Sequence, residues 1–156
     1  MPVTEFATLE LIAPFKVHHS DVLPIFRTLS KRQAAWSGYP LYFYQNTAKP
    51  SEIYLISGWK DVPAHYEWIA SQGNQELLTM FKPYLDVKDL VHLDLDFREI
   101  KKGVGYLEVE VTREEANADE GESCGPDMVW NGSGKDAEGK RDGIWLESAR
   151  TRRAQI

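Results

Sequence analysis

Hydrophobic and polar residues alternate near the start of the chain, over Val3–Ala13. Side chains two residues apart point to the same side of a strand, so Ala7, Leu9 and Leu11 share one face. The alternation predicts a β-strand with one face drier than the other. Glu10 falls on the other face of this strand.

Apolar residues then recur at helical spacing from Val22 to Leu29 and on toward Trp36. This spacing predicts an amphipathic helix. Ser20 is the expected N-cap, because its hydroxyl can accept a hydrogen bond from the first turn. Gly38 is the expected end of the helix.

Four further elements complete the first part of the chain. Two aromatic and β-branched runs, Tyr39–Gln45 and Glu52–Trp59, predict a β-hairpin. Two helices are expected next, one capped by Asp61 and ending at Ser71, the other capped by Asn74 and ending at Leu85. The last element is a strand over 87–96. Its drier face is expected to carry Val87, Val91, Leu93 and Leu95, and its other face Leu90, His92 and Asp94.

The resulting order, βαββ(αα)β, predicts a four-stranded antiparallel sheet with helices on one face. This is the ferredoxin-like α+β arrangement. It leaves the other sheet face bare, and we expect either the remaining chain or a second subunit to cover it.

The composition changes near residue 97. Residues 98–156 hold eight of the eleven glycines but none of the four histidines. We therefore place a compact domain at 1–97 and an extension at 98–156, partly disordered or carrying an added β-hairpin. Structured islands are expected at Gly105–Thr112 and Asp127–Ala149.

Charge and cysteine content exclude several classes of protein. The net charge is −6, which argues against a nucleic-acid partner. The single Cys124 excludes an intramolecular disulfide framework and a multi-cysteine zinc site. No apolar run is long enough to span a membrane, and the first residues lack the pattern of a signal peptide. We expect a cytoplasmic protein that uses no metal and no cofactor, since no nucleotide or metal motif occurs.

The later part of the compact domain has a distinctive order of features: a strand ending in Trp, a short helix, a small-residue break, a second helix and a strand containing His. These features occur in Ser57–His65, Trp68–Ser71, Phe81–Leu85 and Leu90–Asp94. The pattern resembles the antibiotic biosynthesis monooxygenase family of the dimeric α/β barrel superfamily, and it is most similar to the fungal members. The resemblance implies a homodimer with a ligand pocket between sheet and helices.

The resemblance also suggests site residues. In the plant polyketide cyclase branch a Tyr and a His act as acid and base, but this sequence has Trp68 and Asn74 at those positions. In the cofactor-free monooxygenase branch Asn, Trp and Tyr groups position a phenolic substrate. Asn74 and Trp68, with Tyr66 or Tyr84, are the corresponding candidates. In the heme-degrading branch a helical His binds iron; His65 is the helical candidate, and nothing around it specifies heme.

His92 is the leading candidate for a general base. Its i+2 neighbour Asp94 shares its strand face, and a carboxylate partner raises the pKa of a histidine and fixes its tautomer. Glu10 is a candidate to join that face from the first strand. Tyr84 is a candidate proton donor. Among the numerous aromatic residues, Trp36 is a candidate for lining a pocket for a flat ligand.

The function expected from these observations is a small, cofactor-free enzyme of secondary metabolism. It would act on a polyketide-like or aromatic intermediate by proton transfer, in a cyclisation, isomerisation or dehydration. Two alternatives remain open. One is a cofactor-independent monooxygenase of a phenolic substrate, and the other is a non-catalytic small-molecule-binding or stress-related protein.

Overall fold

The computed structural model describes residues 1–100, 128–130, 134–139 and 149–150. Four antiparallel strands form its main sheet: β1 (Val3–Leu11), β2 (Leu41–Gln45), β3 (Glu52–Trp59) and β4 (Leu85–Leu93). Their order across the sheet is β2-β3-β1-β4, so the first and last strands of the compact part are neighbours. This order confirms the predicted ferredoxin-like topology.

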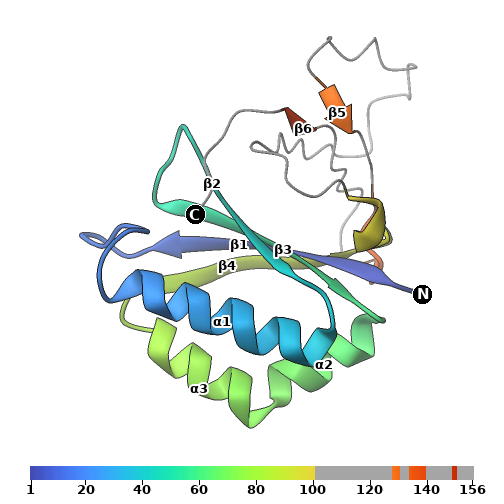
Figure 1. Cartoon of the computed structure of the whole chain (residues 1–156), viewed down its shortest axis with the longest axis horizontal. Coiled ribbons are helices and arrows are strands. Elements are labelled where there is room, and N and C mark those ends of the chain that lie inside the picture. Colours follow the sequence, from blue (N-terminus) through green and yellow to red (C-terminus); the bar gives the residue numbers. More distant parts are fainter. Residues whose placement is uncertain (101–127, 131–133, 140–148, 151–156) are drawn as a thin grey trace.

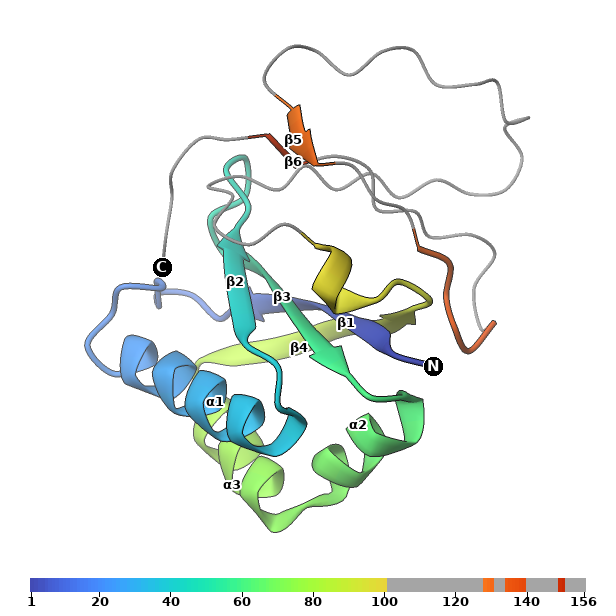
Figure 2. The same ribbon diagram turned by 45° about the vertical axis from the view of Figure 1, so that its right-hand side comes forward.

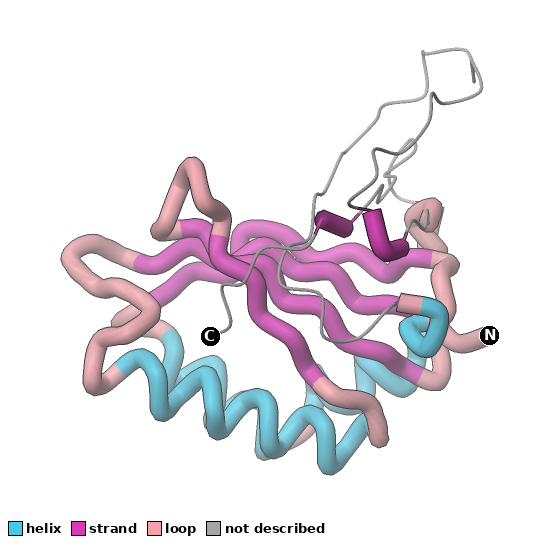
Figure 3. The backbone as a smooth tube through the Cα atoms, turned by 45° about the horizontal axis from the view of Figure 1, so that its top comes forward, coloured by secondary structure: helices cyan, strands magenta, loops and turns pink. Residues whose placement is uncertain are grey.

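Three helices cover one face of the sheet (Figure 1). They are α1 (Val22–Ser37), α2 (Val62–Ala70) and α3 (Gln72–Phe81). The tube view in Figure 3 shows all three on the same side of the strands. A short 3-10 helix, η1 (Phe97–Glu99), follows β4.

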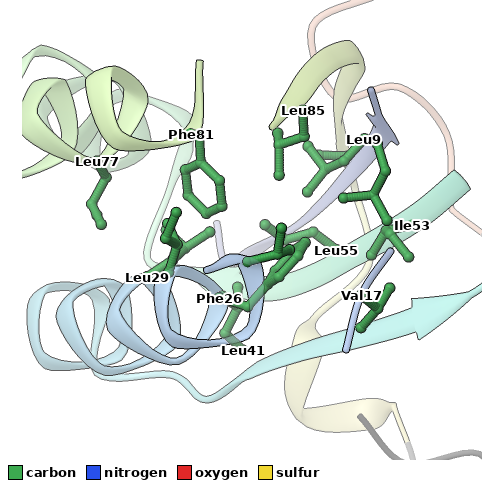
Figure 4. Packing of buried hydrophobic residues seen from close by; sticks show 14 of the residues in the cluster. Leu9, Val17, Phe26, Leu29, Leu41, Ile53, Leu55, Leu77, Phe81 and Leu85 are labelled. Atoms are coloured by element: carbon green, nitrogen blue, oxygen red, sulfur yellow. The ribbon is translucent and has the colours of Figure 1, made fainter. Parts of the chain in front are cut away.

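The main hydrophobic core lies between the sheet and the helices (Figure 4). Phe26 of α1 contacts Phe81 of α3 edge to face, with ring centroids 5.6 Å apart. Ile53 of β3 and Leu77 of α3 are fully buried in this core. Burial of such side chains contributes roughly 1.5–3 kcal/mol each, so this core is what holds the helices on the sheet.

Helix ends differ from the sequence predictions at two places. Asp21, not Ser20, occupies the N-cap of α1, and its side chain makes no capping hydrogen bond. Ser71, not Asn74, caps α3, because the break after α2 is a single residue that must serve both helices. The prediction of Gly38 as the end of α1 is confirmed by its left-handed φ of 79°.

The boundary between α3 and β4 lies earlier than predicted. α3 ends at Phe81 rather than at Leu85. Lys82 still has helical dihedral angles and donates its N–H to the Leu78 carbonyl, but Pro83 has no N–H with which to continue the helix. Leu85 instead opens β4, which ends at Leu93.

A β-bulge in β4 changes which side chains face the helices. The register of β1 against β4 shifts between Thr8 and Leu9, with Asp89 and Val87 as their partners. An extra residue reverses the alternation of side chains beyond it. Val87 is therefore half exposed at the cavity described below, and its predicted place on the dry face is wrong. Val91, Leu93 and Leu95 share one buried face, as predicted, and the structure places this face on the outer side of the sheet.

The outer sheet face carries a second cluster of buried residues. Phe6, Val91 and Leu93 pack there with Phe97 of η1, and Tyr42 lies against Phe97 with ring centroids 5.9 Å apart. The element η1 thus covers part of the face that the topology leaves bare.

Residues 134–139 run beside the end of β4. Backbone hydrogen bonds join Asp94 N–H to the Lys135 carbonyl at 2.9 Å and Ala137 N–H to the His92 carbonyl at 2.6 Å. A Cβ on Gly134 would lie 3.0 Å from Leu93 Cβ, so a side chain there would crowd the strand. This segment therefore brings a piece of the extension to the strand that carries His92.

Two short strands, β5 (Met128–Trp130) and β6 (Ala149–Arg150), pair antiparallel with each other (Figure 2). They fall at the ends of the second predicted island. The first island, Gly105–Thr112, lies outside the described residues, and the division of the chain at residue 97 stays a prediction.

Candidate functional site

A cavity of about 420 Å³ lies between the sheet and the helices. Leucines from β1, α1, β3 and α3 form much of its wall, together with Trp68 and Phe81. Few polar side chains reach it, and Glu5, Gln33, His65 and Asn74 are the buried ones. A mostly apolar cavity with a few convergent polar groups is the usual form of a small-molecule site.

Glu5 is the buried acid of this cavity. It lies on β1 on the same face as Ala7 and Leu9, and only 3% of it is exposed. Gln33 Nε2 and Trp59 Nε1 both donate to its Oε2, at 2.6 Å and 2.8 Å. Burial raises the pKa of Glu5 to about 7, although these two hydrogen bonds act in the opposite direction.

His65 of α2 is placed beside the other oxygen of Glu5. The Asp61 side chain caps α2 by accepting from Ala64 N–H, which fixes the first turn just before His65. His65 Nε2 lies 3.5 Å from Glu5 Oε1, and its ring stacks on Trp59 with centroids 4.4 Å apart. Burial, and to a smaller extent the neighbouring His92, lowers the pKa of His65 from its ordinary value to about 3. His65 is therefore neutral at physiological pH.

His92 lies behind His65, away from the cavity wall. Its Nε2 is 2.6 Å from His65 Nδ1, and its Nδ1 is 2.9 Å from Glu138 Oε2. The Tyr66 hydroxyl donates to the other oxygen of Glu138, at 2.7 Å. The side chain of His92 is fully buried, whereas that of Glu138 is 16% exposed.

Three of the residues singled out in the sequence line the cavity: His65, Trp68 and Asn74. Two others are connected to it through side chains. His92 contacts His65, and Tyr66 contacts His92 with ring centroids 5.7 Å apart.

The remaining candidates lie outside the cavity lining. Asp94 accepts a hydrogen bond from the backbone N–H of Lys135 at 2.5 Å, rather than from His92. Tyr84 packs edge to face on Phe15. Trp36 is half exposed against Trp68.

Glu10 does not share the face of His92. The register pairs His92 with Glu5, and Glu10 is an odd number of residues further along β1. Glu10 instead forms ion pairs with Lys49 at 2.7 Å and Lys88 at 3.4 Å. The carboxylate that meets the histidines from β1 is therefore Glu5.

Four members of this network were missed in the sequence: Glu5, Gln33, Trp59 and Glu138. A signal existed for two of them. Glu5 interrupts the dry face of its strand, two residues before Ala7, and Gln33 lies four residues after Leu29 on the apolar stripe of α1. A polar residue on an apolar face marks a buried polar contact. Nothing in the Gly-rich surroundings of Glu138 indicates its role.

Within the described ranges, no three His, Cys, Asp or Glu side chains are grouped so as to hold a metal ion. Over the same part of the chain, none of the helices combines the length and the hydrophobicity needed to cross a bilayer.

Comparison with known proteins gives a likeness of fold. No family model and no curated protein matches the sequence. Among solved structures, the structural-genomics protein YJCS superposes with a TM-score of 0.50 at 13% identity, over 62% of this chain and 100% of that chain. SnoaB, a cofactor-independent oxygenase from Streptomyces nogalater, gives 0.49 at 15% identity, over 57% and 89%.

An antibiotic biosynthesis monooxygenase of 20% identity gives a TM-score of 0.44, over 59% of this chain and 97% of that chain. The structural neighbours thus include proteins described as antibiotic biosynthesis monooxygenases. The likeness to YJCS, at 13% identity, shows a shared fold only. The neighbours do not support a fungal-type subgroup. The class defined by the fold is the ferredoxin-like α+β class, with a sheet, a helical layer and a cavity between them.

Proposed function

We propose that this protein binds a small, largely apolar molecule in the cavity and catalyses a proton transfer on it. The observation that carries the proposal is the Glu5 carboxyl, which faces an apolar cavity with a pKa raised to about 7. A general acid–base group works best when its pKa lies near the working pH. Cyclisation, isomerisation and dehydration of a carbonyl compound all need such a group.

Hydrogen bonding distinguishes the two oxygens of Glu5. Oε2 accepts from both Gln33 and Trp59, so it is held in place. Oε1 faces His65 Nε2 and is the oxygen that exchanges a proton. A carboxyl whose geometry is fixed by two donors before the substrate arrives is preorganised for proton transfer.

Other candidates take supporting roles in this proposal. Trp68 and Asn74 line the cavity and would contact a flat substrate. His92, expected from the sequence to be the base, acts through His65 as a positioning residue, since it does not line the cavity.

A cofactor-independent oxygenation is the second candidate reaction. It would begin with the same step, because removal of a proton by Glu5 leaves a substrate anion that can itself reduce O₂. The two reactions differ only in whether O₂ is consumed, so the buried base of the cavity supports either one.

Anthrone is a suitable probe for both reactions. It is a tricyclic aromatic ketone whose methylene group loses a proton to give an aromatic anion. Deuterium uptake at this methylene in D₂O without oxygen, followed by NMR, measures proton transfer. Oxygen uptake under air measures oxygenation.

The full chain should accelerate deuterium uptake, and Glu5→Gln should lower the rate by roughly 10²–10⁴-fold, the usual contribution of a general base. Glu76→Gln is the matched control, since Glu76 is an exposed carboxylate of α3 that pairs with Arg32 outside the cavity lining. Binding of anthrone with equal, unaccelerated exchange in all three proteins would contradict catalysis and favour a binding protein.

A further inference from the structure

We infer that Glu5, His65, His92 and Glu138 form a proton relay that connects the cavity with the surface of the protein. The outer end of this relay, Glu138, belongs to the C-terminal extension. The inference rests on the proposed function, because it describes how the acid–base group of the cavity regains or loses its proton.

The four side chains lie in order from the cavity outward, each next to the following one. Glu5 Oε1 lies 3.5 Å from His65 Nε2, His65 Nδ1 lies 2.6 Å from His92 Nε2, and His92 Nδ1 lies 2.9 Å from Glu138 Oε2. Each imidazole uses both of its nitrogens, one toward each neighbour. The first link is longer than a hydrogen bond, so the carboxyl and the imidazole must approach each other for transfer.

Exposure increases along the same path. Glu5, His65 and His92 are at most 3% exposed. The Glu138 side chain is 16% exposed, and Tyr66, which donates to it, is 43% exposed. Water therefore reaches the outer end of the chain of groups while the inner members are buried.

The hydrogen bonds have one consistent direction. A carboxylate only accepts, so His92 Nδ1 carries the proton that is donated to Glu138. His92 Nε2 must then accept from His65 Nδ1–H. His65 Nε2 is left with a lone pair directed at Glu5 Oε1, which suits a histidine that is neutral at physiological pH.

Transfer through this arrangement is balanced. The O–H bond of Glu5 and the Nδ1–H bonds of His65 and His92 break. New bonds form at His65 Nε2, His92 Nε2 and one oxygen of Glu138. One proton has then moved from Glu5 to Glu138, both imidazoles remain neutral with exchanged tautomers, and Glu5 is left as the carboxylate that can accept a proton from a substrate.

The groups that face these residues come from several elements. Glu5 is faced by Gln33 of α1, Trp59 of β3 and His65 of α2. Among the described residues, the side chains that contact the His92 ring are those of His65 and Tyr66 of α2 and of Glu138. Segment 134–139 is fixed to β4 by backbone hydrogen bonds, so Glu138 is held at the outer histidine by main chain as well as by side chain.

Exchange of the buried His65 ring N–H with water tests the relay without any substrate. It is measured by NMR on ¹⁵N-histidine-labelled full chain at pH 7, in the unchanged protein and in Glu138→Gln. A glutamine amide can still accept from His92 and donate to the Tyr66 hydroxyl, but it cannot take up the relayed proton. Glu76→Gln serves as the control.

The relay predicts that Glu138→Gln slows the exchange of the His65 ring N–H on the order of tenfold. It also predicts that both imidazoles carry their protons on Nδ1 in the unchanged protein. A purely structural role predicts the reverse, because a loosened segment would let water in and speed the exchange. Unchanged or faster exchange, or a proton on Nε2 of either ring, would overturn the relay.

The anthrone assay adds a second readout. The relay predicts that Glu138→Gln lowers kcat for deuterium uptake while KM is unchanged, and that a small diffusible buffer such as imidazole restores part of the rate. If the unchanged protein does not process anthrone, the proposed function fails there, and the ring-exchange measurement still decides the relay.

Discussion

Glu5 is unusual because, among the described residues, its side-chain partners are hydrogen-bond donors and a neutral histidine rather than a lysine or an arginine. Gln33 and Trp59 donate to one oxygen, and the neighbouring His65 is neutral because its pKa is lowered to about 3. Burial therefore dominates, and the carboxyl retains its proton to about pH 7. Glu10, on the same strand, shows the contrast: Lys49 and Lys88 lower its pKa below the usual value.

The raised pKa of Glu5 predicts a change of stability with pH. The folded protein holds the Glu5 proton more tightly than the unfolded chain, whose carboxyl has the ordinary value of 4.5. The stabilisation from the protonated form is complete below pH 4.5 and is lost as pH rises through 7. A shift from 4.5 to about 7 corresponds to ~3 kcal/mol in the free energy of unfolding.

Glu5→Gln isolates this contribution, because a glutamine keeps the acceptor for Gln33 and Trp59 and can donate to His65 as a protonated glutamate does. Urea unfolding measures this. Between pH 4.5 and 7.5 the free energy of unfolding of the unchanged protein should fall by a few kcal/mol relative to that of the variant, because only the unchanged protein ionises at this position. The lowered pKa of His65 makes the free energy of unfolding fall as the pH decreases below 6.5, but this effect is the same in both proteins and cancels in the comparison. A constant difference across this range would contradict a raised pKa.

At the scale of elements, periodicity predicts the order of strands and helices and the helical layer. Periodicity does not predict features that depend on a single residue, such as a bulge or a helix cap. The bulge in β4 moves Val87 to the cavity side, and a period-two pattern cannot reveal an inserted residue. The cap of α3 is Ser71 rather than Asn74, because two helices share one short break.

The cap of α2 is expected to matter for the site, since it precedes His65 by one turn. Asp61→Ala removes the hydrogen bond to Ala64 N–H and should lower the free energy of unfolding by about 1 kcal/mol. Asp21→Ala is the matched control, because Asp21 occupies the N-cap of α1 without a capping side-chain bond. Urea unfolding of both variants checks this. Equal effects would show that the Asp61 cap adds no stability.

At the scale of the whole molecule, the site combines residues that sequence order keeps far apart. His65 and His92 are candidates from the sequence, His65 as the histidine on a predicted helix and His92 as a strand histidine two residues before Asp94. Their connection to Glu5 needed the register of β1 against β4, and their connection to Glu138 needed the packing of segment 134–139. The segment lies inside the predicted island Asp127–Ala149, but nothing in its sequence indicates that it packs on β4, because its residues show no periodic hydrophobic pattern.

The predicted homodimer can be tested at the same scale. Outer-face residues Phe6, Ile56 and Phe97 are buried within the single chain, partly by η1, so burial of this face does not by itself require a partner. Light scattering coupled to size exclusion should give twice the chain mass of 17.8 kDa if the prediction holds. A mass of one chain across the micromolar range would contradict it.

The protonation of Glu5 can be measured directly by a ¹³C NMR titration of side-chain carboxyl signals in the full chain. Glu5→Gln identifies the signal by its disappearance. An acid–base group poised in the cavity predicts a midpoint near 7. A midpoint near the ordinary value of 4.5 would show that Glu5 is ionised at neutral pH like a surface carboxylate, and would contradict its role as the acid–base group of the site.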